Sequence, residues 1–252
     1  MLDVQKAGMW KRISAALFDF ILLGILAVAM AFLISAAVDY DGYSKQFEAM
    51  SDSYEAAYGV DFDIAREEYD ALTPEARAYF DAAYNAFATD VEVNRVYNLM
   101  FQFTLLILIF GVLGAFLVLE FVLPLLLGNG QTLGKKIFGV GVMREDCVKL
   151  TGVLLFARAI LGKYTVEVML PILVLVMMTF GLAGVGGMAV LAILAGVELA
   201  LFVGTKGHTV LHDKLSHTVT VDIATQRIFD TPEALLAYKQ RIHAEAAERA
   251  DG

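Results

Sequence analysis

The chain has 252 residues, of which 58% are hydrophobic and 19% charged, and it contains one cysteine, Cys147. Its formal net charge is −9 at pH 7. A composition this apolar is typical of a polytopic membrane protein, and an acidic chain without a basic soluble domain argues against nucleic-acid binding.

Four segments are long and apolar enough to span a bilayer. Residues 13–38 and 99–127 each provide one crossing, and residues 165–204 provide two, with the sequence GLAGVGG as the turn between them. Apolar runs of about 18 or more residues with few charges predict membrane-spanning helices. We therefore predict an all-α polytopic membrane protein with four transmembrane helices.

The first apolar segment is predicted to remain in the mature chain. Lys11 and Arg12 precede it, as basic residues precede the core of a secretory signal peptide. The apolar core of such a peptide has about 7–15 residues, whereas this run is longer and carries Asp19. Residues 1–38 are therefore expected to form a short N-terminus and the first transmembrane helix.

Residues 39–98 are predicted to form an acidic helical cap outside the membrane. They carry 14 acidic and four basic side chains, a net charge of −10. Their aromatic residues and alanines recur at three- and four-residue steps, as on an amphipathic helix. Thr73-Pro74-Glu75 is typical of a helix start. The cap is either a solvated insertion without a ligand or a surface that attracts a partner or cations.

Basic side chains set the predicted orientation. Residues 1–12 carry three basic side chains and one acidic one, and residues 128–164 carry six and two. Lys and Arg near the ends of membrane spans stay on the cytoplasmic side. Both segments are therefore placed inside and residues 39–98 outside. Four crossings return the C-terminus to the inside, so both termini are expected in the cytoplasm.

The loop GNGQTLGKK, residues 128–136, resembles a phosphate-binding loop but lacks the required spacing. The position of the first required glycine holds Asn129, and Lys136 stands where Ser or Thr is needed. We therefore predict that no nucleotide binds. The loop is interpreted as the turn at which the chain leaves the membrane, with Lys135 and Lys136 at anionic lipid headgroups.

Residues 128–164 are expected to form a cytoplasmic loop with some structure of its own. Residues 139–143 and 218–221 alternate in polarity as short strands do, and we expect them to pair on the cytoplasmic side. Residues 150–163 are assigned to an interfacial helix. The alternative is that they begin a long third helix that is kinked near Pro171.

Carboxylates interrupt the apolar segments. Asp19 lies in the first, Glu120 in the second and Glu198 in the fourth, and Glu167 lies near the inner end of the third. A charged side chain in a bilayer costs several kcal/mol and usually faces the bundle interior or a water-filled path. One interpretation is an ion or proton pathway through Asp19, Glu120 and Glu198, with Arg158 as a counter-charge. The other is that the carboxylates hold helices together.

Three blocks of the sequence resemble one known family. They are RISAALFD at residues 12–19, GQTLGKKIFGVGVM after the second apolar segment, and HDKLSHTVTV after the last one. The chain is similar here to the RDD family of bacterial membrane proteins, named for an arginine and two aspartates. The resemblance places this trio at Arg12, Asp19 and Asp213. It implies a multi-pass protein of the bacterial inner membrane, and sodium/proton antiport is reported for some members.

Specific contacts are expected for this trio near the inner face. We predict that Asp213 lies close to Lys135 or Arg12, with Arg12 or a nearby lysine within hydrogen-bonding reach. Asp19 should pair with a basic side chain, since an ionised carboxylate facing lipid there would cost about 2.5–3.5 kcal/mol. The candidate partners of Asp19 are Arg158, Lys163 and Lys135.

The segment 205–252 contains no pattern that clearly indicates a metal, cofactor or catalytic site. His208, His212 and His217 have a spacing that can hold zinc on a helix face, but Gly207 and Thr209 make a helix doubtful there. We predict no metal, no cofactor and no catalytic residues, because no nucleophile or paired carboxylate marks a soluble pocket. The end of the chain is predicted to be a charged, Ala-rich helix.

Two functional classes follow from the sequence. The first is a non-catalytic membrane scaffold or assembly factor, and the second is a cation (Na⁺)/proton transporter. Four helices form a thin wall for a solute pathway, so a transporter would need to oligomerise. The small residues Ala192, Gly196 and Ala200 offer a close-packing face for a second copy or a membrane partner.

Overall fold

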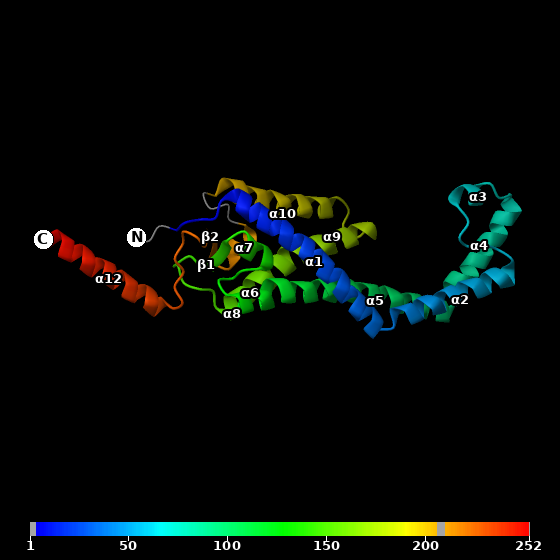
Figure 1. Ribbon diagram of the computed structural model, residues 1–252. Coiled ribbons are helices and arrows are strands. Elements are labelled where there is room, and N and C mark those ends of the chain that lie inside the picture. Colours follow the sequence, from blue (N-terminus) through cyan, green and yellow to red (C-terminus); the bar gives the residue numbers. More distant parts are fainter. Residues whose placement is uncertain (1–3, 206–209, 252) are drawn as a thin grey trace. The chain divides into compact units, whose positions relative to one another are not determined.

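The computed structural model describes residues 4–205 and 210–251 (Figure 1). It divides into two compact units, one formed by Met1–Ala27 with Leu113–Gly252 and the other by Val28–Val112. Helices dominate the fold, as predicted, and the described residues include one two-stranded sheet.

Within the described part of the chain, four helices are long and apolar enough to cross a membrane. They are α1 (Met9–Ala37), a helix over Val91–Leu127, a helix over Gly152–Thr179, and α10 (Gly184–Gly204). Few residues of α1 and α10 are buried against the rest of the protein. Their apolar surface is therefore available to lipid, which confirms the predicted four membrane-spanning helices.

Helix α1 turns one narrow face toward the protein. Its buried residues are Arg12, Ala15 and Asp19, which follow one another at steps of three and four and therefore lie on one side of the helix. Large apolar side chains such as Phe20 and Phe32 lie on the exposed surface. The two charged residues thus occupy the face that packs, and lipid can cover the remainder.

The second span combines three helical stretches. Helix α5 (Val91–Phe116) continues as the π-helix η1 (Leu117–Val122) and ends with α6 (Leu123–Leu127). A π-helix widens the turn by one residue and is frequent at functional sites. The widened turn η1 contains the buried side chain of Glu120.

The third span begins earlier than the predicted boundary at residue 165. Thr151 caps its start, accepting a hydrogen bond from Leu154 N at 3.3 Å. Helix α8 (Gly152–Phe156), the π-helix η2 (Ala157–Met169) and α9 (Leu170–Thr179) follow without a break, since the residues at both junctions keep helical backbone angles. The segment assigned to an interfacial helix is therefore the first part of this span, which was the alternative interpretation.

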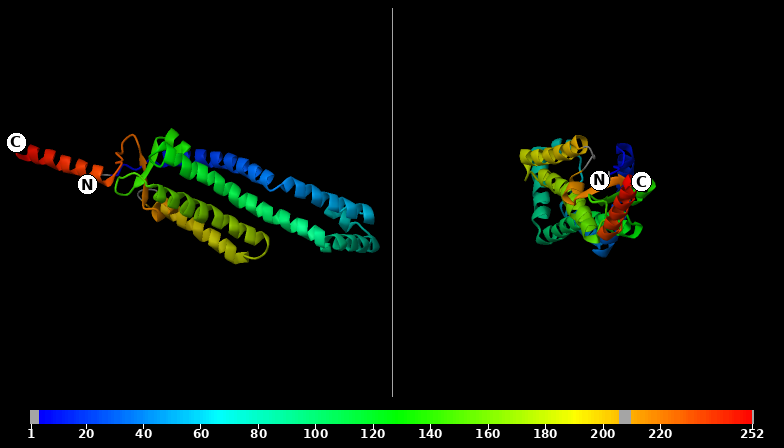
Figure 2. Two further views of the ribbon diagram at one scale, coloured as in Figure 1. Left: turned by 90° about the horizontal axis from the view of Figure 1, so that it is seen from below. Right: turned by 90° about the vertical axis from the view of Figure 1, so that its left-hand side faces the viewer.

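Helices α9 and α10 lie side by side in unit 1 (Figure 2). The chain turns between Thr179 and Gly184, and Gly181 adopts a positive φ of 71° that favours glycine. The predicted turn at GLAGVGG is thereby confirmed.

The two predicted strands pair. Strand β1 (Val140–Arg144) runs antiparallel to β2 (Thr218–Asp222), with Val142 opposite Thr220. Each strand follows a one-turn helix, α7 (Leu133–Ile137) before β1 and α11 (Leu211–Leu215) before β2. The pairing of β1 with β2 therefore brings the glycine loop next to the segment that follows the last span.

Both ends of the described chain meet this sheet. Ala7 N donates to Thr220 O at 3.2 Å, and Lys149 N donates to Phe229 O at 2.9 Å. A small apolar core consisting of Met143, Cys147, Val148, Val221, Phe229 and Leu235 joins the sheet to the start of α12 (Pro232–Asp251). The predicted C-terminal helix is therefore present.

The unit Val28–Val112 contains the acidic insertion. Its helices are α2 (Tyr40–Tyr58), α3 (Arg66–Asp70) and α4 (Pro74–Thr89), followed by the first turns of α5. Thr73 caps α4 as predicted, accepting from Ala76 N at 3.2 Å. Phe87 is the centre of an aromatic cluster that includes Phe47, Tyr54, Phe62 and Tyr84. Aromatic packing therefore stabilises this helical cap, in which the sequence contains no cysteine.

Candidate functional site

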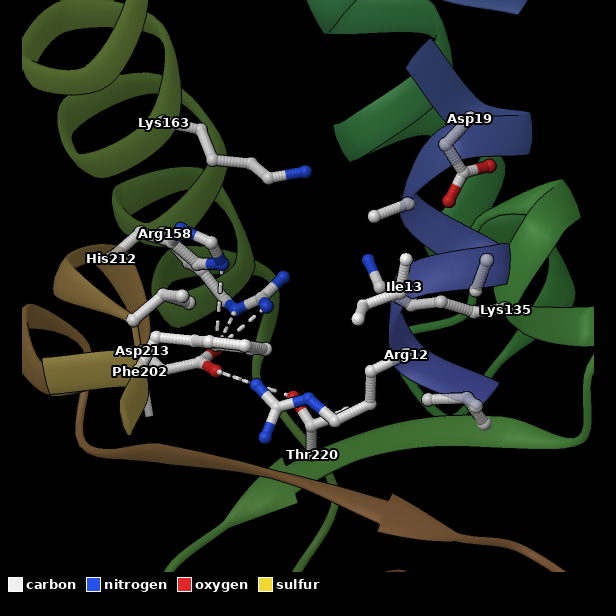
Figure 3. A pocket seen from close by; sticks show the side chains of 14 residues that line it. Arg12, Ile13, Asp19, Lys135, Arg158, Lys163, Phe202, His212, Asp213 and Thr220 are labelled. Carbon is white, nitrogen blue, oxygen red and sulfur yellow. Dashed lines mark hydrogen bonds and ion pairs between the residues drawn. The ribbon is translucent and has the colours of Figure 1, made fainter. Parts of the chain in front are cut away.

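Asp213 is the centre of a buried charge network in unit 1 (Figure 3). Its side chain is 1% exposed and lies in the first turn of α11. Arg158 of the third span donates to Oδ1 from Nε at 3.0 Å and from Nη2 at 2.7 Å. Arg12 of α1 donates to Oδ2 from Nη2 at 3.4 Å, which confirms the predicted contact between Arg12 and Asp213.

Two threonines of β2 complete the contacts of Asp213. Thr218 Oγ1 lies 3.3 Å from Oδ1, and Thr220 Oγ1 lies 3.2 Å from Oδ2. Burial alone would raise the pKa of Asp213, but the positive charge of Arg158 foremost outweighs it and holds the pKa well below its usual range. The carboxylate is therefore ionised and ties two membrane spans to the sheet.

Asp19 lies elsewhere on α1 and has neutral donors as partners. Thr132 Oγ1 donates to Oδ2, and Gly134 N donates to Oδ1 at 2.8 Å. This corrects the expected pairing with Arg158, Lys163 or Lys135, because no ion pair of Asp19 occurs among the described residues. The start of α7 instead delivers a hydroxyl and a backbone N–H to this carboxylate, and the side chain of Lys135 turns toward another partner.

A glycine makes this approach of α7 to α1 feasible. A Cβ atom at Gly134 would collide with Ala15 O, and it would lie 2.9 Å from the carboxyl carbon of Asp19. The glycine-rich loop therefore packs against α1, and this contact explains the Thr-x-Gly pattern at residues 132–134. The role of Thr132 and Gly134 was not predicted from the sequence. The Thr-x-Gly pattern, in a chain with a carboxylate in its first span, was the signal that could have indicated it.

Glu120 pairs with two lysines. Lys163 Nζ donates to Glu120 Oε1, and Lys135 Nζ lies 3.6 Å from Glu120 Oε2. Of the two lysines expected at lipid headgroups, Lys135 has a side chain that is 12% exposed and turned toward Glu120, whereas Lys136 is exposed. Burial lowers the pKa of Lys135 to about 8, although Glu120 opposes this shift.

Glu198 and Glu167 lie in one pocket next to α11. Glu167 Oε1 accepts from His212 N at 2.9 Å and lies 2.8 Å from His212 Nδ1. Glu198 Oε2 accepts from Leu211 N at 3.4 Å. Both glutamates line a pocket of about 350 Å³ between the third span and α10. Sequence reasoning did not foresee the contact of His212 with Glu167.

The three histidines considered as zinc ligands do not form a metal site among the described residues. His208 lies outside the described residues. His212 is bonded to Glu167, and His217 occupies an exposed turn with a φ of 51°. Within residues 4–205 and 210–251, no group of three or more His, Cys, Asp or Glu side chains could hold a metal ion.

The residues predicted as a site thus have different immediate partners. Arg12, Arg158 and Asp213 form one ion-paired cluster. Asp19 is bound to the start of α7, and Glu120 holds the two lysines. Glu198 belongs to the separate pocket beside Glu167.

The fold and this network define a class of protein: a helical membrane protein with four spans, whose buried charges join the spans to a small sheet. The sequence model of the RDD family matches residues 6–217, and the chain belongs to the RDD family. The match includes Arg12, Asp19 and Asp213 and ends before α12. No curated protein and no solved structure matches the chain.

Proposed function

We propose that this chain is a non-catalytic scaffold or accessory protein of a bacterial inner membrane, with both termini in the cytoplasm. The observation that carries the proposal is the coordination of Asp213. Its buried carboxylate accepts hydrogen bonds from Arg12 on α1 and Arg158 on the third span. A carboxylate with this many fixed partners is suited to holding segments together rather than to binding and releasing a solute.

The proposed orientation has support of its own. The N-terminal segment contacts the sheet through a hydrogen bond of Ala7 with Thr220, and Phe229 of the C-terminal segment packs in the apolar core that contains Met143 and Val221. The basic clusters in residues 1–12 and 128–164 belong to the same unit as the sheet. Positive charge near span ends favours the cytoplasmic side, so we place the sheet and both termini there.

A scaffold needs a surface for its partner, and α10 offers one. Ala192, Gly196 and Ala200 follow each other at four-residue steps and are exposed. A Cβ atom at Gly196 would have no neighbour within 4 Å in the described structure. Small residues at this spacing let a second helix approach closely in a bilayer. We infer that a second copy or a membrane-protein partner packs here.

A second candidate function is exchange of a cation or a proton. The observation that favours it is Glu198, a carboxylate of α10 whose Oε1 is buried and which lines a pocket between two spans. A second carboxylate, Glu167, lines the same pocket. Carboxylates inside membrane spans often mark ion or proton sites, so Glu198 is the residue on which this alternative depends.

Ion flux separates the two candidates. Everted membrane vesicles containing the overexpressed chain are energised, and the change in internal pH is followed after addition of NaCl. The scaffold proposal expects no flux above that of vesicles without the chain. Flux that is lost in Glu198→Gln and kept in Glu233→Gln, at equal protein levels, would establish transport instead. Glu233 is a suitable control because it is an exposed residue of α12.

A further inference from the structure

A cavity beside the charge network has features that the scaffold does not need. It has a volume of about 160 Å³ and lies between α1, the third span and the segment after α10 (Figure 3). Four basic side chains line it, and they are Arg12, Lys135, Arg158 and Lys163. Small-molecule sites usually measure about 300–1,000 Å³, so this space suits a small charged group.

The carboxylates around the cavity are already committed. Asp213 is shared by two arginines, and Glu120 is shared by two lysines. Asp19 is bound by the neutral donors Thr132 and Gly134. Four positive side chains and two carboxylates line the cavity. Glu120 lies outside the lining but pairs with two of the lysines, and even with its charge included one positive charge is in excess. Glu167 is bonded to His212 and does not line the cavity.

Lys135 retains hydrogen-bonding capacity inside the protein. Its Nζ is buried and has no hydrogen-bond partner among the residues that the structure describes, and Glu120 Oε2 is 3.6 Å away. An ammonium group has three donors, and leaving them unsatisfied in a buried place is costly. An anion with several oxygens in the cavity would satisfy them.

Apolar side chains near the ends of the spans also line the cavity. Ile13 and Ala16 of α1 and Phe202 of α10 contribute to the lining. Ile13 is four residues from the start of α1 and Phe202 two residues from the end of α10, which places both within roughly 6 Å of a span end. That depth corresponds to the boundary between lipid headgroups and acyl chains.

We propose that this cavity binds a phosphate group, presented by the headgroup of an anionic phospholipid, with Lys135 as the principal donor. The acyl chains would then lie against the apolar side chains of Ile13 and Phe202. The lipid would connect α1 to α10 at the headgroup level. The proposed lipid site is compatible with a scaffold and with a transporter, because it involves neither Glu198 nor a transport pathway.

The test measures lipid binding by the purified full-length chain in detergent. Phosphatidylglycerol and phosphatidylcholine with identical acyl chains are titrated, and bound lipid is read by native mass spectrometry together with the melting temperature. We expect the unmodified chain to bind phosphatidylglycerol more tightly than phosphatidylcholine. Lys135→Gln should weaken the binding of phosphatidylglycerol at least about tenfold, because it removes a charge-assisted hydrogen bond. Lys239→Gln, which removes the same charge from an exposed residue of α12, should change the affinity less than about twofold.

A second variant guards against a folding defect in Lys135→Gln. Ala16 lines the cavity and is exposed on α1, so Ala16→Leu fills the cavity without removing any charge. It should also lose the preference for phosphatidylglycerol. Inorganic phosphate is titrated in parallel: stabilisation by this ion that depends on Lys135, without lipid binding, would assign the site to free phosphate and overturn the lipid source. Equal binding of both lipids by the unmodified chain would overturn the proposal.

Discussion

Asp213 connects two arginines that come from different membrane spans. Such a network is costly to bury, and its members depend on each other, because removal of one partner leaves an uncompensated charge at a cost of about 3–5 kcal/mol. The contact of Arg12 with Asp213 could be predicted, since the blocks around residues 12 and 213 resemble one family. The partners of Asp19 could not, because Thr132 and Gly134 reach it only through the close packing of α7 on α1.

Replacing Asp19 by asparagine should destabilise the protein. The amide retains one acceptor oxygen, so either Thr132 or Gly134 N loses its acceptor. The loss of a hydrogen bond to a charged group costs about 1.5–3 kcal/mol. The melting temperature of Asp19→Asn in detergent should fall clearly below that of Asp52→Asn, which changes an exposed residue of α2. Equal melting of the two variants would contradict a structural role for Asp19.

His212 should make stability depend on pH. Burial lowers its pKa below the ordinary value, and Arg158 adds to this effect while Asp213 and Glu167 oppose it. The folded state therefore favours the neutral ring. The stability gained from His212 is complete above the unfolded pKa of about 6.5 and is lost as the pH falls below that value toward the lower folded pKa.

The measurement is the melting temperature between pH 8 and pH 5. The unmodified chain should lose more stability over this range than His212→Asn, in which the titrating ring is absent. His217→Asn is the matched control, since His217 is exposed, and it should follow the unmodified chain. Identical profiles for all three proteins would exclude His212 as the source of the dependence.

At the scale of elements, the short helix α7 determines how the glycine loop packs. The pairing of β1 with β2 followed from the alternation of the sequence and its two short apolar segments. The start of the third span did not, because Arg158 and Lys163 made residues 150–163 look interfacial. Their charges are accommodated by Asp213 and Glu120 inside the protein, so the helix can continue through this region.

Glycine at residue 134 is predicted to be essential for the contact of α7 with α1. A methyl group there would collide with Ala15 O, so Gly134→Ala should destabilise the protein by about 1–3 kcal/mol, as overpacking does. Gly152→Ala is the control, because its nearest neighbour would be Leu125 at an ordinary 3.8 Å. That change should be neutral or slightly stabilising, since alanine favours helix. Unfolding in denaturant measures both, and equal stability of the two variants would contradict the packing of α7.

For the whole molecule, we predict that the acidic cap and the sheet lie on opposite sides of the membrane. The hydropathy of the spans and the positions of the basic residues favour this topology. Reporters of compartment at residue 60, in the insertion, and at residue 240, in α12, test it. The residue 60 reporter should respond outside and the residue 240 reporter inside. Finding both on one side would contradict the four-span topology.

We propose that the charge network around Asp213 holds two spans and the sheet together. A double-mutant cycle tests it most directly, with Arg158→Met, Asp213→Asn and both changes combined, each unfolded from detergent micelles. We expect the double variant to lose less stability than the sum of the single variants, by at least about 1.5 kcal/mol, since contacting buried charges couple by about 0.5–3 kcal/mol. Additive losses, or single variants as stable as the unmodified chain, would contradict it.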